Sequence, residues 1–196
     1  MKIAIIIAST RPGRVGPSVA EWVLQEASKR KDAKFEMVDL AEQNLPFLNE
    51  AEQPATGKYS HETTKNWSKL INGYDGFILV TPEYNHSFPA TLKNALDMLY
   101  HEWSYKPFGL VSYGNLSGAR AVEALRQVLI NFNAATVRPQ VSLALATDFV
   151  DNKVAKPQDF QAPALKSMID AMMLWEKGLS VIRAEIAEKK KNKKKA

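Results

Sequence analysis

The sequence predicts an α/β protein, with a parallel sheet of five strands and helices packed on both of its faces. Short apolar runs rich in β-branched residues alternate along the chain with segments of helical periodicity, which is the pattern of repeated β–α units. Three of these apolar runs also lead directly into polar loops. Because parallel strands end at one edge of their sheet, a ligand is expected at that edge.

The chain has 196 residues, 45% of them hydrophobic and 24% charged, an ordinary composition for one globular domain. No apolar run approaches the roughly 18 residues that a membrane-spanning helix requires. The apolar run after Met1 is short for a secretory signal and fits better as a strand. We therefore expect a cytoplasmic protein that does not insert into a membrane.

The chain contains no cysteine, which excludes a disulfide framework, a thiolate nucleophile and a cysteine-ligated metal. Its three histidines, His61, His86 and His101, lie far apart in the sequence and form no paired ligand motif. We expect no metal site.

The net charge of +5 comes from the C-terminus. Residues 1–188 carry 20 Lys and Arg against 21 Asp and Glu, a net charge of −1. We predict a near-neutral domain over 1–188 and a Lys-rich tail over 189–196. A solvated helix end is the preferred interpretation of the tail; the alternative is a module that binds nucleic acid or an anionic membrane. The six charges of the tail are Lys189, Lys190, Lys191, Lys193, Lys194 and Lys195.

The first half of the chain opens with a strand over residues 2–8. A helix from Gly16 to about Arg30 follows, with Pro17 suited to its first turn. Residues 35–40 alternate like a shorter strand near the sheet edge, and residues 41–61 form a long polar excursion.

The remaining predicted elements continue the alternation. A helix over 61–72, a strand over 75–81, a helix over 89–100 and a strand from Pro107 to Ser112 come first. Ser117 is then expected to cap a helix. The last strand lies within 136–146, interrupted near Pro139, and a polar loop over 147–161 precedes a helix from about Ala164 to Lys189. This connectivity fits the flavodoxin-like strand order 2-1-3-4-5.

The loop after the first strand has the composition of a phosphate site. Ser9 and Thr10 supply hydroxyls, Arg11 and Arg14 supply fork-shaped donors, and the next helix offers unpaired backbone N–H groups. The loop matches neither the P-loop nor the Rossmann glycine motif. The alternative is an ordinary turn with solvated arginines.

Two further loops suit a flat polar ring. Residues 82–89 place Glu83, Tyr84, Asn85 and His86 between two prolines, so amide groups could bind a ring edge and Tyr84 could pack against its face. The alternative is a turn with a surface tyrosine, and we prefer it for His86. Residues 112–118 carry glycines that permit close backbone approach to a ligand, or simply shape a turn for packing.

These motifs together resemble the NADPH-dependent FMN reductase family, which includes flavodoxin-like quinone, azo-dye and chromate reductases. The resemblance covers about residues 2–145. It rests on Ser9-Thr10-Arg11-x-x-Arg14-Val15-Gly16-Pro17, on Pro82-Glu83-Tyr84-Asn85 and on Leu92-Lys93-Asn94-Ala95-Leu96-Asp97.

The resemblance implies a set of FMN-binding residues in three groups. The phosphate would lie against Ser9, Arg11 and the stretch of Arg14, Val15, Gly16, Pro17 and Ser18. The isoalloxazine and ribityl chain would follow Pro82, Glu83, Tyr84 and Asn85, and the pyrimidine end of the ring would meet Ser112, Tyr113 and Gly114. Where the family often has two glycines, this chain has Gly114-Asn115.

The activity implied is a two-electron transfer from NADPH through FMN to a quinone, azo dye or metal oxyanion. Backbone donors of residues 112–114 would stabilise negative charge on the reduced ring, and no catalytic side chain is assigned. The alternative is a flavodoxin-type electron carrier without its own NADPH oxidation. The resemblance also implies a homodimer or homotetramer, either through the apolar segment 98–103 or with that segment covering its own sheet.

Overall fold

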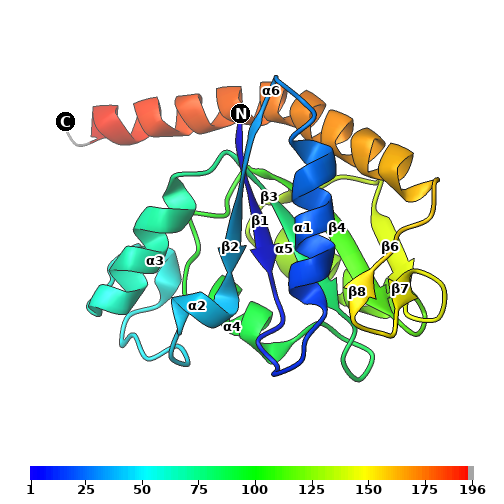
Figure 1. Cartoon of the computed structure of the whole chain (residues 1–196). Coiled ribbons are helices and arrows are strands. Elements are labelled where there is room, and N and C mark those ends of the chain that lie inside the picture. Colours follow the sequence, from blue (N-terminus) through cyan, green and yellow to red (C-terminus); the bar gives the residue numbers. More distant parts are fainter. Residues whose placement is uncertain (194–196) are drawn as a thin grey trace.

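The computed structural model describes residues 1–193 and contains the predicted parallel sheet (Figure 1). The strand order is β2-β1-β3-β4-β5, and β6 continues the fifth position beside β4, so both the order 2-1-3-4-5 and the interruption near Pro139 are confirmed. All of these strands pair in parallel. Their bounds are β1 Lys2–Ile7, β2 Lys34–Asp39, β3 Gly76–Pro82, β4 Pro107–Gly114, β5 Ala135–Thr136 and β6 Val141–Ala144.

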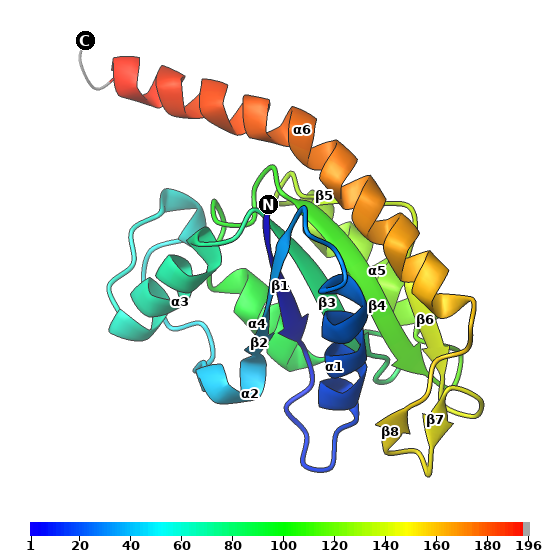
Figure 2. The same ribbon diagram turned by 45° about the horizontal axis from the view of Figure 1, so that its top comes forward.

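Helices cover both faces of the sheet (Figure 2). Helices α1 and α6 pack on one face and α3, α4 and α5 on the other. The bounds are α1 Gly16–Ala27, α2 Leu40–Gln43, α3 Glu62–Asn72, α4 Ala90–Asp97, α5 Ala119–Ile130 and α6 Gln161–Lys193, with a short 3-10 helix at Pro54–Thr56.

Several predicted bounds shift at the ends of the elements. Helices α1 and α4 end three residues earlier than expected, and β4 runs two residues further, to Gly114. Helix α6 begins at Gln161 and continues through residues 189–193 of the predicted tail; residues 194–196 lie outside the described residues. Within residues 1–193, no helix combines the length and the apolar character needed to cross a bilayer.

The two cores follow from the alternation of side chains along the strands. In β1, Ile3, Ile5 and Ile7 point toward α1 and α6, whereas Ala4 and Ile6 point toward the opposite face, as a repeat of two residues requires. Every one of these side chains is at most 3% exposed. Burial on both faces explains why the central strands are apolar throughout.

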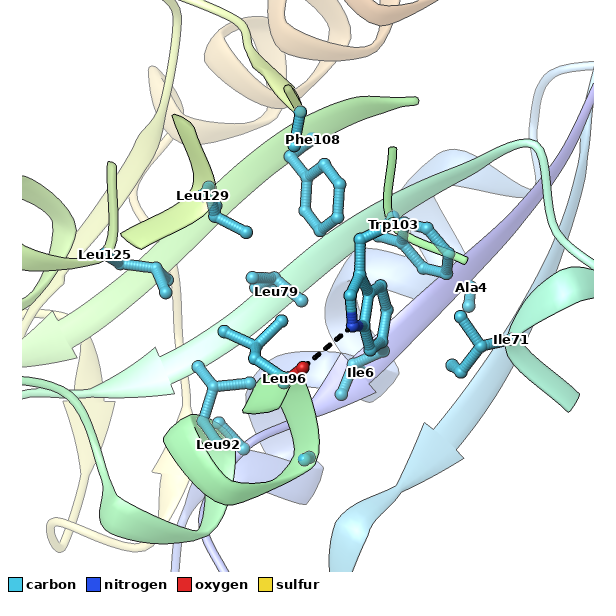
Figure 3. Packing of buried hydrophobic residues seen from close by; sticks show 14 of the residues in the cluster. Ala4, Ile6, Ile71, Leu79, Leu92, Leu96, Trp103, Phe108, Leu125 and Leu129 are labelled. Carbon is cyan, nitrogen blue, oxygen red and sulfur yellow. Dashed lines mark hydrogen bonds between the residues drawn. The ribbon is translucent and has the colours of Figure 1, made fainter. Parts of the chain in front are cut away.

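The segment after α4 packs on the sheet of its own chain. Met98, Leu99 and Trp103 are fully buried, and the Trp103 indole N–H donates to the Leu96 carbonyl at 3.1 Å (Figure 3). The ring lies 4.9 Å from that of Phe77, edge to face. Of the two interpretations of residues 98–103, the covering of its own sheet is therefore correct, and these three apolar side chains offer no surface to a second subunit.

The segment after β6 is more ordered than the predicted loop over 147–161. It forms an antiparallel hairpin of β7 (Phe149–Val150) and β8 (Val154–Ala155). Asp151 and Asn152 form its turn at φ angles of 51° and 53°, positive values that Asn and Asp tolerate better than most residues. The hairpin was missed because each strand is only two residues long.

Candidate functional site

The three predicted loops meet around one cavity at the C-terminal edge of the sheet, in the lower part of Figure 1. Strands β1, β3 and β4 are neighbours in the sheet, so the loops that follow them lie side by side. The cavity has a volume of about 210 Å³. Its lining residues are Arg11, Arg14, Val15, Pro82, Glu83, Tyr84, Tyr113, Gly114, Leu145 and Asn152.

The first loop leaves the start of α1 open to an anion. Val15 occupies the N-cap position, and no side chain caps the helix, so the first N–H groups lack the partner that a cap supplies. Pro17 occupies the first turn, as predicted. The partial positive charge of a helix start favours an anion at this point.

The two arginines of the first loop have different partners. Arg14 holds the Asp39 carboxylate with two nitrogens, at 2.7 and 2.5 Å, and also donates to the Ser9 carbonyl oxygen. It therefore ties the loop to the end of β2, and Asp39 is a residue that the sequence did not single out. Arg11 is exposed at the cavity, and within residues 1–193 its guanidinium has no hydrogen-bonding partner, which leaves it able to bind a ligand.

The loop after β3 makes a tight turn. Tyr84 and Ser87 exchange backbone hydrogen bonds of 2.8 and 3.0 Å. Between them Asn85 and His86 have φ angles of 49° and 69°, which are those of a type I′ turn. The Tyr84 hydroxyl lies 2.7 Å from the buried Ser9 hydroxyl, so this turn is linked to the first loop.

Glu83 fixes the same loop to α5. Its carboxylate accepts from the Arg120 side-chain Nε at 2.6 Å and from the Arg120 backbone N–H at 3.1 Å. Burial opposes the charge of Glu83, but its bonds to Arg120 prevail and hold its pKa below the ordinary value. The prediction that Ser117 caps this helix is wrong. Gly118 occupies the N-cap position and makes no side-chain hydrogen bond. The Glu83 carboxylate instead accepts from a backbone N–H group of the first turn, that of Arg120.

Tyr113 brings a buried hydroxyl to the start of α1. The residue is 4% exposed, and its hydroxyl has no hydrogen-bonding partner in the described part of the chain. A Cβ atom at Gly16 would lie 2.9 Å from that oxygen, so the phenol is near the predicted phosphate end rather than the pyrimidine end. Burial raises the pKa of Tyr113, which keeps the phenol protonated and available as a donor.

The predicted role of the 112–114 backbone as donors to the ring is wrong. Strand β4 continues through Gly114 and is paired with β3 on one side and β6 on the other, so these peptide groups belong to the sheet. The Ser112 hydroxyl is also internal, since it donates to the Ser117 carbonyl at 2.7 Å. Only Tyr113 and Gly114 of this group line the cavity.

Glycines shape the third loop. A Cβ atom at Gly118 would lie 2.6 Å from Ser112 Cβ, and the φ angle of Gly118 is +75°. A Cβ atom at Gly114 would lie 3.3 Å from Glu83 Cβ. No side chain fits at Gly118 without a shift, so both glycines serve the close packing of this loop on its neighbours.

The hairpin of β7 and β8 supplies one wall of the cavity, which the sequence did not predict. Asn152 in its turn and Leu145 after β6 line the cavity. The Ser18 hydroxyl accepts from the Ala155 backbone N–H at 2.7 Å and so anchors the hairpin on α1. In the sequence Asn152 follows Asp151, and both residue types are common in turns. This pair therefore indicated a turn, but not its contact with the cavity.

A doubly wound parallel sheet with a cavity between the loops that follow β1, β3 and β4 defines a protein of the flavodoxin-like class. The model of the NADPH-dependent FMN reductase family matches residues 1–148, and the chain belongs to this family.

Relatives agree with this assignment, and a solved structure shares the fold. An NAD(P)H-dependent FMN reductase of Schizosaccharomyces pombe is 40% identical over 146 residues, covering 72% of this chain and 73% of that protein. A quinone reductase of Pseudomonas putida is 31% identical over 186 residues, covering 89% and 94%. The structure of FerB, a flavoenzyme NAD(P)H:acceptor oxidoreductase from Paracoccus denitrificans, superposes with a TM-score of 0.70 at 22% identity, over 90% of this chain and 97% of that chain; this likeness concerns the fold.

Proposed function

We propose that this protein is an FMN-dependent NAD(P)H oxidoreductase that reduces small acceptors in two-electron steps. Membership of the family supports the reaction class. The observation that carries the site is the buried hydroxyl of Tyr113, which has no hydrogen-bonding partner among residues 1–193, beside the uncapped start of α1. A buried donor without a partner is costly, and a phosphate group at this position would satisfy it.

The residues of the cavity fit FMN. The phosphate would be held by Arg11, the first N–H groups of α1 and Tyr113, which are all hydrogen-bond donors. Arg11 carries a positive charge and the helix start carries a partial positive charge. Pro82, Tyr84 and the Asn85 turn would lie along the ring and the ribityl chain. Gly114 leaves space at the ring, since it has no side chain.

FMN, when bound, supplies the chemistry by accepting a hydride from the nicotinamide and passing two electrons to the acceptor. The protein binds and orients it. The Glu83–Arg120 pair holds the 82–88 loop on α5, and the Arg120 guanidinium lies 2.7 Å from His86 Nε2. We assign no proton transfer to a side chain.

Three finer features belong to the proposal. The acceptors are quinones or azo dyes, supported by relatives named quinone reductase and NADPH azoreductase, or metal oxyanions, which rest on the resemblance alone. The nucleotide is NADPH, as in the name of the family. The protein is a homodimer or homotetramer, which rests on the resemblance alone, and it is cytoplasmic, which rests on its sequence.

A purified preparation tests the proposal. We expect flavin absorbance that survives gel filtration or returns on adding FMN, and NADPH oxidation that depends on both FMN and benzoquinone. A protein that stays colourless after FMN is added would overturn the site. Bound flavin without NADPH oxidation would indicate an electron carrier instead.

A further inference from the structure

Helix α6 carries an apolar face that no part of residues 1–193 covers. Leu174, Trp175, Val181 and Ile182 are 67%, 50%, 56% and 42% exposed. Successive helical residues are about 100° apart, so these four lie within a sector of about 120°. The opposite side of the same helix is buried, with Met172 at 0% and Leu179 at 8% exposed. We call the four exposed residues, with Gly178 at their centre, the α6 stripe.

The α6 stripe is symmetric about Gly178. Leu174 and Ile182 are each four residues from the glycine, and Trp175 and Val181 are each three residues from it. If two copies of α6 pack antiparallel with their Gly178 residues opposed, Leu174 of one copy faces Ile182 of the other. Trp175 then faces Val181. This self-complementary arrangement is what a two-fold interface requires.

Gly178 has no explanation within the subunit. Among the described residues, no atom outside the local helix lies within 4 Å of a Cβ built on it, and it has an ordinary helical conformation rather than a positive φ. Glycine is among the least favourable residues in a helix interior. Its use there is explained if a second backbone approaches closely at this point.

The charges beside the α6 stripe suit the same arrangement. Lys166 lies twelve residues before Gly178 and Glu188 lies ten residues after it, so antiparallel copies place them within about 3 Å along the helix axis. Both side chains are exposed; within the subunit Lys166 already donates to the Asp170 carboxylate at 2.7 Å, so a second copy would add Glu188 to this pair. Lys177 is on the flank of the stripe, where its long side chain can reach water.

We propose that the α6 stripe is an interface with a second copy of this chain, formed by antiparallel α6 helices that cross at Gly178. A lipid surface is the rival occupant, and the vesicle assay below distinguishes it from a second copy. The projecting C-terminal half of α6 lies at the opposite edge of the sheet from the cavity (Figure 2). The inference gives an interface to the homo-oligomer named under the proposed function, and it does not rest on the flavin chemistry.

The first test is the mass of the particle in solution, measured by sedimentation. Gly178→Leu has room in the subunit and improves helix propensity, so we expect it to keep its helical circular dichroism and to have half the mass of the wild type. Ala184→Leu is the matched control, since it adds the same side chain to the same helix outside the sector, and should keep the wild-type mass. Equal masses for the wild type and Gly178→Leu would overturn the proposal.

The second test uses the absence of cysteine from the sequence. Under mild oxidation, Gly178→Cys should cross-link two copies efficiently because it lies on the two-fold axis. Ile182→Cys should not, because its two copies would be about 12 Å apart along the axis, beyond the reach of a disulfide. A mixture of Leu174→Cys and Ile182→Cys chains should form the cross-linked heterodimer. Equal cross-linking of Gly178→Cys and Ile182→Cys alone would overturn the antiparallel arrangement.

A vesicle assay decides against the rival occupant. We expect that the wild type does not co-sediment with phosphatidylglycerol vesicles, so that Trp175→Ser has no vesicle binding to remove. A subunit that is monomeric in solution and binds such vesicles through Trp175 would overturn the proposal in favour of a lipid surface. Ile130→Ser is the control, because Ile130 is 72% exposed on α5.

Discussion

The carboxylate of Glu83 accepts hydrogen bonds from both the side chain and the backbone of Arg120. Glu83 directly follows the end of β3, and Arg120 lies in the first turn of α5. One side chain therefore positions the turn that contains Tyr84 and replaces the missing N-cap of a helix. The Glu83 side chain is 6% exposed, so water does not readily substitute for either bond.

Glu83→Gln should weaken both the fold and the site. The neutral amide keeps the size of the side chain but loses the ion pair, and we expect a loss of about 1–2 kcal/mol in the free energy of unfolding. FMN affinity should fall as the 82–88 loop loosens. Urea unfolding and flavin titration measure the two effects. Glu123→Gln, on the exposed side of α5, is the control and should change neither.

The pH dependence of this variant gives a separate check. The pKa of Glu83 is lowered in the folded protein, so its contribution to stability is present above the unfolded pKa of about 4.3. That contribution is lost as the pH falls through the lower folded value. The difference in stability between wild type and Glu83→Gln should therefore be constant near neutral pH and shrink in acid. A difference that is independent of pH down to acid unfolding would show that the charge of Glu83 is not the cause.

Arg11→Ala should reduce FMN affinity by about tenfold to a hundredfold, since charge-assisted bonds to a phosphate contribute about 1.5–3 kcal/mol. The stability of the flavin-free protein should not change, because this side chain is exposed. Arg138→Ala removes another exposed arginine away from the cavity and should leave affinity unchanged. Unchanged flavin occupancy at limiting FMN would contradict the phosphate assignment.

Tyr113→Phe should have opposite effects on the free and the FMN-bound protein. Removing an unpartnered buried hydroxyl should leave the flavin-free protein as stable as before or more stable by about 1 kcal/mol. FMN affinity should fall about tenfold if this hydroxyl donates to the phosphate. Thermal unfolding with and without FMN reports both changes. A variant that is destabilised without FMN and keeps its affinity would assign Tyr113 to packing alone.

Gly118→Ala and Gly13→Ala separate backbone strain from steric contact. Both glycines have positive φ angles, +75° and +69°, but only Gly118 has close neighbours. Alanine at Gly13 should cost about 1 kcal/mol of unfolding free energy from the left-handed conformation alone. At Gly118 the added contact with Ser112 should raise the cost to about 2–4 kcal/mol. Equal costs at the two positions would show that the third loop relaxes around the methyl group.

Lys106→Met should stabilise the protein at pH 7. Burial lowers the pKa of Lys106 to about 8, while its Nζ has one hydrogen bond, to the Ile71 carbonyl at 3.3 Å. Because the folded state binds fewer protons than the unfolded state between pH 8 and about 10.4, wild-type stability should rise over that range. The advantage of methionine, about 1–3 kcal/mol at pH 7, should therefore disappear in alkali. Lys93→Met, at an exposed position, should show no such trend.

Much of the site could be predicted from the sequence because its parts are local. The order of polar loops after apolar runs placed Ser9, Arg11, Tyr84 and Gly114 at one sheet edge, since parallel strands share that edge. The polar loop from Pro82 to Asn85 was placed there on the same basis, and the family motif agreed with it. None of these inferences needed knowledge of which side chains meet.

The errors lie where a residue depends on a distant one. Ser117 has the composition of a helix cap, yet the helix is satisfied by Glu83, which lies 37 residues from Arg120. A strand that ends at Ser112 would leave the backbone of residues 113 and 114 free, whereas β4 continues through Gly114 and pairs there with β6.

The sequence by itself determined the alternation of strands and helices, and with it the expected strand order, because burial repeats along each element with the period of that element. The class of ligand came from the residues of the loops between these elements and from the family resemblance. The tertiary structure alone decided that Arg14 binds Asp39, that Tyr113 points its hydroxyl under Gly16 and that Trp103 covers its own sheet. The physical reason is that such contacts depend on how separate elements cross in space, and the period of a single element carries no record of its neighbour.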